Sequence, residues 1–139
     1  MKPELQVGDV VRRVAFYNVH GELVPEVTGM TVTKVYQDEV NHWRITAERA
    51  TYPTYADGPA LIFGPMTPAP RFQPGDAVTL AATRNVRGEP VPEVKGLTVW
   101  FIHWVANHWR VQAGPRPGER WTHEASEALF TPTAEGATL

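Results

Sequence analysis

The chain contains one sequence unit twice, and this repeat constrains its fold more than any other feature. The motif Asn-His-Trp-Arg occurs at residues 41–44 and again at residues 107–110. When the chain is shifted against itself by 67 residues, positions 5–32 lie over positions 72–99, and 16 of these 28 pairs are identical. A one-residue gap follows, after which the two copies of the motif align. Such self-similarity predicts two units that share one fold.

A proline-rich stretch separates the two copies. Residues 64–74 contain four of the 13 prolines, at positions 65, 68, 70 and 74. Proline-rich segments are stiff and extended, so we place the boundary near Pro68. The prediction is a first unit over residues 1–67 and a second over residues 68–139. A length of 139 residues fits two very small domains as well as one of ordinary size.

Each copy predicts about five short strands and little helix. Gly21 and Gly88 lie midway between runs rich in β-branched residues, where a glycine supplies the positive φ of a tight hairpin. Gly29 and Gly96 are expected to interrupt the chain before the next strand. No window has a sustained helical period, and the best candidate is one turn at residues 123–128. This order of elements predicts an all-β protein made of two tandem SH3-like five-stranded barrels.

Short motifs recur in both copies: G-D-x-V, then M-T-V or L-T-V, then a downstream Trp. The residues concerned are Gly8, Asp9, Val11, Met30, Thr31, Val32 and Trp43, and then Gly75, Asp76, Val78, Leu97, Thr98, Val99 and Trp109. In this the copies resemble the small SH3-like barrels of bacterial and phage proteins, the YodC-like proteins in particular, and more distantly the KOW-type barrels. The chain departs from the YodC-like pattern in two ways: Pro25 lies five residues before the Met, and there is no Cys near the Trp. The resemblance implies a fold and a binding role, and it names no ligand.

The repeated polar and aromatic residues favour structural roles. Asp9 and Asp76 each follow a glycine at a strand entrance, where a carboxylate accepts hydrogen bonds from backbone N–H groups and fixes a turn. Trp43 and Trp109 alternate with apolar residues, so we expect both to face a core. Arg44 and Arg110 would then point outward, to solvent or to an acidic neighbour; the candidate acids are Glu26 and Glu93.

Motifs for catalysis, cofactors and metals are missing from the sequence. There is no cysteine, and Ser126 is the only serine and lacks the glycines of a nucleophile elbow. Phosphate-cradling glycine motifs are absent. His103 and His108 are five residues apart, an odd spacing that places them on opposite faces of a strand. We therefore expect no enzymatic activity, no cofactor and no metal site.

The largest difference between the copies is aromatic. Trp100, Phe101 and Trp104 take positions that are Thr33, Lys34 and Gln37 in the first copy. Exposed aromatic residues are typical of interfaces. Three covers are open at this point: the other barrel, a protein partner or a second copy of the chain, and the stacked bases of single-stranded nucleic acid. With Arg84 and Arg87 of the hairpin as a charged rim, these residues are the predicted partner-binding site.

The expected function is therefore that of a non-enzymatic binding or regulatory protein that recognises a protein partner. A phage-encoded inhibitor of a host protein is one form of it. The alternative is a KOW-like module associated with nucleic acid or the transcription machinery, although a net charge of −2 disfavours a polyanion. No apolar run approaches the roughly 20 residues of a membrane helix, and no signal-peptide core is recognisable. The expected compartment is a reducing cytoplasm, without membrane attachment.

Overall fold

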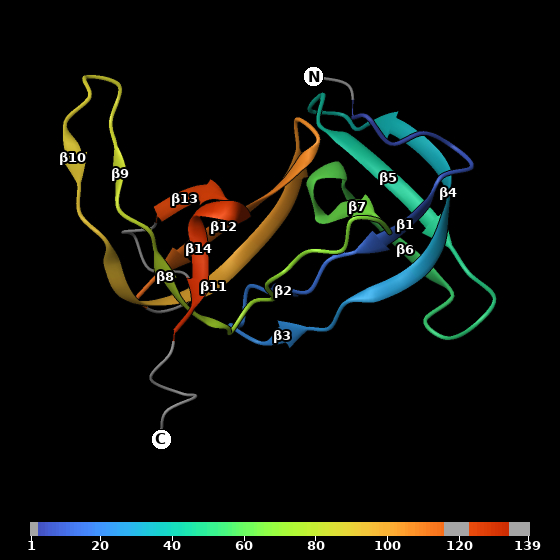
Figure 1. Cartoon of the computed structure of the whole chain (residues 1–139). Coiled ribbons are helices and arrows are strands. Elements are labelled where there is room, and N and C mark those ends of the chain that lie inside the picture. The colour runs from blue at the N-terminus through green and yellow to red at the C-terminus, as the bar shows by residue number, and fades with distance from the viewer. Residues whose placement is uncertain (1–2, 116–122, 134–139) are drawn as a thin grey trace.

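A computed structural model of the chain describes residues 3–115 and 123–133, and it confirms the all-β expectation. The first five-stranded sheet contains β1 (Val10–Arg13), β4 (Val27–Gln37), β5 (Trp43–Glu48), β6 (Tyr55–Pro59) and β7 (Phe63–Pro65). Their order across the sheet is β6-β5-β4-β1-β7, and all neighbours are antiparallel (Figure 1).

The second five-stranded sheet has the same strand order. It contains β8 (Ala77–Leu80), β11 (Val94–Val105), β12 (His108–Gly114), β13 (His123–Ser126) and β14 (Phe130–Pro132), arranged as β13-β12-β11-β8-β14. Figure 1 shows the two sheets side by side. The strand pairings of the described residues leave both sheets open, so closed barrels and a tandem duplication stay predictions. The outer limits of the two predicted units, residues 1 and 139, lie outside the described part.

Each half also carries a short hairpin. The two hairpins are β2 (Phe16–Tyr17) with β3 (Leu23–Val24), and β9 (Thr83–Arg84) with β10 (Pro90–Val91). Their turns contain Gly21 at φ 77° and Gly88 at φ 79°, which confirms the predicted role of these glycines. The side-chain oxygens of Asn18 and Asn85 accept two backbone N–H groups each and close the same turn twice.

Gly29 and Gly96 do not interrupt the chain, and that expectation is wrong. Both lie inside long strands, β4 and β11, with φ of 70° and 74°. The strand register shifts beside each of them. Glycine at positive φ is the first residue of a G1-type β-bulge, so each strand bends here and continues.

The helical segments of residues 3–115 and 123–133 are two single 3₁₀ turns, η1 (Ala60–Ile62) and η2 (Glu127–Leu129). The turn predicted over residues 123–128 is wrong in its first part, because residues 123–126 form β13. Neither turn, and no other described segment, provides a helix with the length and apolar character needed to cross a membrane.

Two buried apolar clusters lie on the two sheets. The first is made of Val11, Val27, Met30, Val32, Ile45, Ala47, Ala56 and Phe63. The second is made of Val14, Phe72, Val78, Leu97, Val99, Ile102, Trp109, Val111, Ala113 and Phe130. Val14 belongs to the first half of the chain but packs in the second cluster, and Ile62 packs against both. The two halves are thus in direct apolar contact.

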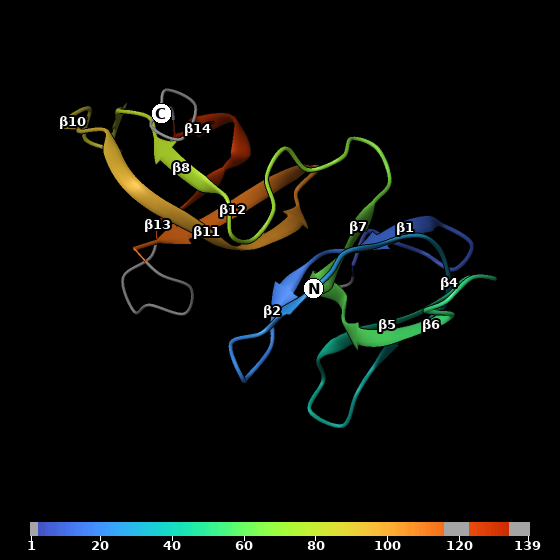
Figure 2. The same ribbon diagram turned by 90° about the horizontal axis from the view of Figure 1, so that it is seen from below.

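The proline-rich connection between β7 and β8 is held at both ends. Its start is fixed by Arg12, whose guanidinium donates to the carbonyl oxygens of Pro65 (3.0 Å) and Met66 (2.6 Å). Its end is fixed by Phe72, which is buried in the second cluster. Figure 2 shows this connection passing from one sheet to the other. It is therefore packed against both halves.

Candidate functional site

The repeated motif Asn-His-Trp-Arg begins at a turn and continues into a strand. Asn41 (φ 64°) and Asn107 (φ 65°) are both left-handed, a conformation that Asn adopts more readily than most residues. The two Trp residues that follow differ in burial. Trp109 is 1% exposed and belongs to the second apolar cluster, whereas Trp43 is half-buried and lies outside the first cluster. The expected core position is therefore confirmed for Trp109, whereas Trp43 is only half-buried.

Arg44, the last residue of the first motif, belongs to a polar cluster on the outer face of the first sheet. Its guanidinium pairs with Asp57 at 3.0 Å. Asp57 also accepts from the hydroxyls of Thr46 (2.6 Å) and Tyr36 (2.8 Å). Burial opposes ionisation of Asp57, but the hydrogen bonds from these three residues outweigh it and lower its pKa. Lys34 lies over the Tyr36 ring, 4.4 Å from its centroid, and completes the cluster.

Arg110 occupies the corresponding place in the second sheet. It donates to Glu124 at 3.1 Å, and Gln112 donates to the same carboxylate. These hydrogen bonds, with that from Gln112 the strongest influence, lower the pKa of Glu124. His103 lies 3.8 Å from Glu124; burial, only partly offset by that carboxylate, lowers the pKa of His103. In each sheet, therefore, a carboxylate on an edge strand is held by two residues of the adjacent strand, an Arg and a second hydrogen-bond donor.

The prediction that Glu26 and Glu93 are the acidic partners of Arg44 and Arg110 is wrong. Glu26 pairs with Arg12 at 3.0 Å, and Glu93 approaches Lys95 at 3.7 Å. A different prediction is confirmed, because Asp9 and Asp76 both act in turns. Each accepts from a backbone N–H three residues earlier, at 2.8 and 2.9 Å.

The predicted aromatic site is divided by the strand that carries it. The register of β11 against β12 shifts between Val99 and Phe101, so Trp100 is the extra residue of a bulge. Its ring contacts Phe101, with centroids 6.2 Å apart, and Phe101 stacks on His103 at 5.4 Å. Trp100, Phe101 and His103 are all half-buried. We call these three residues the outer aromatic group.

Trp104 lies on the other face of β11. It follows buried Ile102 by two residues, packs against the second apolar cluster and makes an edge contact with Trp109 at 5.3 Å. Alternate residues of a strand share a face, so Trp104 is separated from Phe101 by the sheet itself. Trp100, Phe101 and Trp104 therefore do not form one continuous surface.

Arg84 and Arg87 lie on the hairpin of β9 and β10. Arg84 donates to the carbonyl oxygen of Gly88 at 2.7 Å, and Arg87 is exposed in the turn. In Figure 1 this hairpin projects away from the sheet. Among the contacts of the described residues, none joins these arginines to the aromatic side chains of β11. They do not form the rim that the sequence predicted.

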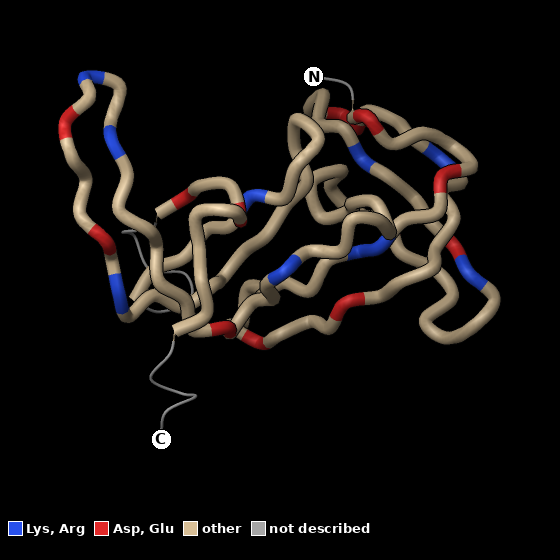
Figure 3. Tube along the Cα trace, viewed as in Figure 1, with Lys and Arg blue, Asp and Glu red and all other residues tan. Residues whose placement is uncertain are grey.

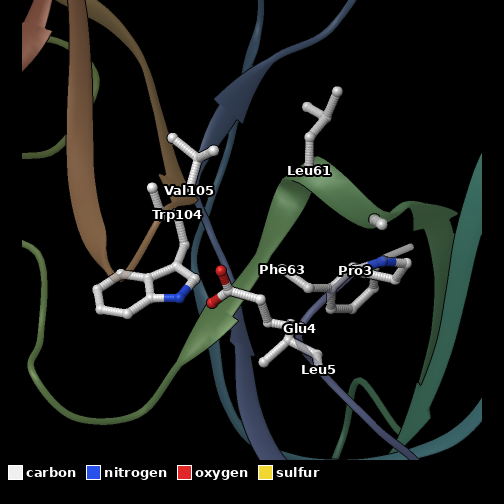
Figure 4. Close-up of a pocket in the computed structure, with 9 residues that line it drawn as sticks. Pro3, Glu4, Leu5, Leu61, Phe63, Trp104 and Val105 are labelled. Atoms are coloured by element: carbon white, nitrogen blue, oxygen red, sulfur yellow. The ribbon is translucent and has the colours of Figure 1, made fainter. Parts of the chain in front are cut away.

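Two grooves lie along the η1 side of the first half, and the sequence indicated neither of them. One is mostly apolar, has a volume of about 470 Å³ and is lined by Pro3, Glu4, Leu5, Ala60, Leu61, Phe63, Trp104, Val105 and Ala106. Figure 4 shows the Trp104 indole on one side and Phe63 and Leu5 on the other. Trp104 therefore contributes to the junction between the halves, which is one of the three covers considered for it.

The second groove has a volume of about 490 Å³ and is built around the first Asn-His-Trp-Arg motif. It is lined by Asn41, His42, Trp43, Arg44, Pro59, Ala60 and Leu61. Leu61 is half exposed, and the Trp43 side chain makes none of the side-chain hydrogen bonds found within residues 3–115 and 123–133. The sequence carries no signal for this groove, because the motif reads the same in both copies, whereas only Trp109 of the second copy is hydrogen-bonded to the connection.

The two grooves and the outer aromatic group offer apolar contacts and hydrogen bonds to a partner. In the part of the chain that the structure describes, no three His, Asp or Glu side chains are grouped so that they could hold a metal ion. Comparisons of the chain with protein-family models, with curated proteins and with solved structures gave no match.

Proposed function

We propose that the chain is a tandem of two SH3-like units that acts as a non-enzymatic binding protein. It recognises a protein partner through the outer aromatic group of the second unit. The observation that carries this proposal is a contrast between corresponding positions. Where the first sheet presents exposed Thr33 and Lys34, the second presents the half-buried aromatic pair Trp100 and Phe101.

The surroundings of this pair resemble those of a binding hot spot. Phe101 stacks on His103, and the ion pair of Arg110 with Glu124 lies beside them on the same face. Aromatic and Arg side chains dominate the energetics of protein interfaces, and a polar margin excludes water around them. In this arrangement Arg110 and Glu124 form the margin. Arg84 and Arg87, on the projecting hairpin, would meet only a partner large enough to reach both places.

The experiment that tests this function exchanges the pair for its counterparts. The double variant Trp100→Thr, Phe101→Lys is expected to keep the fold, because the introduced residues are those of the corresponding positions in the first half, where Thr33 and Lys34 are exposed. Affinity purification with mass spectrometry should show a partner with the parent chain and lose it with the variant. Val19→Ala, on the first hairpin at 96% exposure, is the matched control. Identical partner lists for parent and double variant would reject the proposal.

Single-stranded nucleic acid is the second candidate, because an aromatic pair at a surface can stack bases. Figure 3 shows Lys and Arg interspersed with Asp and Glu along both halves, and such a distribution gives little electrostatic attraction to a phosphate chain. The test is binding of oligothymidine at two salt concentrations. Binding that falls steeply with salt and disappears in the double variant would favour this function over a protein partner.

A further inference from the structure

The proline-rich connection lies across the second half as a bound peptide would. The indole Nε1–H of Trp109 donates to the carbonyl oxygen of Pro68 at 2.8 Å. Three residues later, the backbone N–H of Arg71 donates to the carboxylate of Glu127 in η2 at 2.9 Å. Residues 68–71 thus bridge the distance between the second Asn-His-Trp-Arg motif and the 3₁₀ turn of the same half, and Trp109 beneath them is almost fully buried.

Among the residues that the structure describes, none is hydrogen-bonded to the Trp43 side chain at the same place in the first half. The groove of about 490 Å³ extends from Trp43 to Ala60, and Ala60 corresponds to Glu127. A shift of 67 residues makes residues 1–4 the counterparts of residues 68–71. Of these, the structure describes Pro3 and Glu4, which line the neighbouring groove beside Ala60 and Leu61. No described residue covers the Trp43 end.

We propose that the groove at Trp43 binds an extended, proline-containing peptide of a partner protein, with the Trp43 indole in the role that the Trp109 indole has toward Pro68. Ala60 has no carboxylate, so the anchor that Glu127 provides for Arg71 has no side-chain equivalent in the first half. A polyproline-type backbone has no internal hydrogen bonds, so its carbonyl oxygens are available to an indole N–H. Proline also restricts the free peptide, which lowers the entropy lost on binding. Pro59 and Leu61 line the same groove and supply apolar surface beside Trp43.

The occupant is a segment of another protein, not the corresponding segment of a second copy of this chain. In each copy residues 68–71 are already bound by Trp109 and Glu127. The proposed site is also separate from the outer aromatic group, which lies in the other half. Its test and that of the proposed function can therefore fail independently.

The test is a titration of the ¹⁵N-labelled full chain with a synthetic peptide, Met-Thr-Pro-Ala-Pro-Arg-Phe, which copies residues 66–72. The five Trp indole N–H signals are assigned with single Trp→Phe variants. The expected result is a saturable shift of the Trp43 signal with the Trp109 signal unchanged. Trp43→Phe should weaken binding at least about tenfold through the lost hydrogen bond and contact, and Trp100→Phe should not alter it. A peptide with both prolines replaced by Ala should bind more weakly.

Three outcomes would overturn the proposal. The first is no saturable shift of Trp43 at millimolar peptide. The second is equal binding by the parent and by Trp43→Phe, provided the other four indole signals show that the variant is folded. The third is binding only after residues 1–2 are removed, which would mean that the groove is filled by the chain's own N-terminal residues.

Discussion

Gly64 lies against the ring edge of Trp109, so closely that a Cβ atom on Gly64 would overlap three carbon atoms of the indole. The contact joins the two halves, because Gly64 lies in β7, an edge strand of the first sheet, and Trp109 belongs to β12 of the second. It has no equivalent elsewhere in the described chain: the counterpart of Gly64 is exposed Thr131, and the counterpart of Trp109 is half-buried Trp43. The two halves have the same strand order, but this contact between them is made by Trp109 and not by its counterpart Trp43.

Gly64→Ala is expected to destabilise the protein. The added methyl group must displace the fully packed ring of Trp109, and overpacking of this kind costs about 1–3 kcal/mol of unfolding free energy. Urea denaturation followed by Trp fluorescence measures the change. Thr131→Ala is the matched control at the corresponding exposed position, where we expect a change within about 0.5 kcal/mol. Equal stabilities for Gly64→Ala and the parent would contradict the close contact.

The two motif tryptophans should differ in their contribution to stability. Trp109→Phe removes a buried hydrogen bond to Pro68 and leaves a small cavity, with an expected loss of about 1–3 kcal/mol. Trp43→Phe alters a half-buried residue whose side chain makes no hydrogen bond within the described residues, so the expected loss is below about 1 kcal/mol. Urea denaturation of both variants gives the comparison. A larger loss for Trp43→Phe would show that the assignment of the junction is wrong.

The sequence predicted local features well because they depend on a few neighbouring residues. The turn role of Asp9 and Asp76 and the hairpin glycines follow from backbone geometry that those residue types favour, and the structure confirms them. The prediction for Gly29 was wrong because a glycine at positive φ occurs both where a strand ends and within a strand at a β-bulge. The all-β class was predictable from the absence of a helical period.

The candidate site was less predictable, because strand register decides it. Phe101 and Trp104 are three residues apart in a regularly paired part of β11, so they lie on opposite faces of the strand, and the bulge leaves Trp100 without a pairing partner on β12. Nothing in the residue types marks the bulge. The acid partner of Arg44 was missed for a related reason: Asp57 is on β6, and its place opposite Thr46 depends on the register between β5 and β6. The junction at Gly64 also escaped, since the motif containing Trp109 reads the same in both copies.

Asp57 should make stability depend on acid pH. Its pKa is lowered in the folded protein below the ordinary value of 3.8, so the unfolded chain takes up the proton first as the pH falls. The stabilisation is present above about pH 5 and is lost as the pH falls through the lowered pKa. In urea denaturation, Asp57→Asn should be less stable than the parent at pH 7, and the difference should shrink toward pH 3. The exposed-residue variant Glu39→Gln is the control. A difference that is constant with pH would reject this role of the carboxylate.

His103 should add a pH dependence in a higher range. Burial lowers its pKa below the ordinary value of 6.5, so the unfolded chain binds the proton more readily and stability falls as the pH drops below about 6.5. His103→Tyr introduces the residue found at the corresponding position, Tyr36, and removes this titration. Unfolding measured from pH 7.5 to 5.5 should show a smaller pH dependence in the variant than in the parent. Parallel curves would mean that protonation of His103 does not affect folding.

Arg12 is expected to be the most sensitive charged residue of the first half. Its side chain is 7% exposed, pairs with Glu26 at 3.0 Å and donates to the carbonyl oxygens of Pro65 and Met66. Arg12→Met leaves one carboxylate and two carbonyls without their donor, and breaking such a buried pair costs about 3 kcal/mol or more. Glu26→Gln should cost less, because an amide oxygen still accepts from the guanidinium.

Urea denaturation of the two single variants and of the double variant gives the coupling energy between Arg12 and Glu26. Additive losses would show that Arg12 stabilises the start of the connection through its carbonyl contacts alone, and an unchanged Arg12→Met stability would show that it does not stabilise it at all.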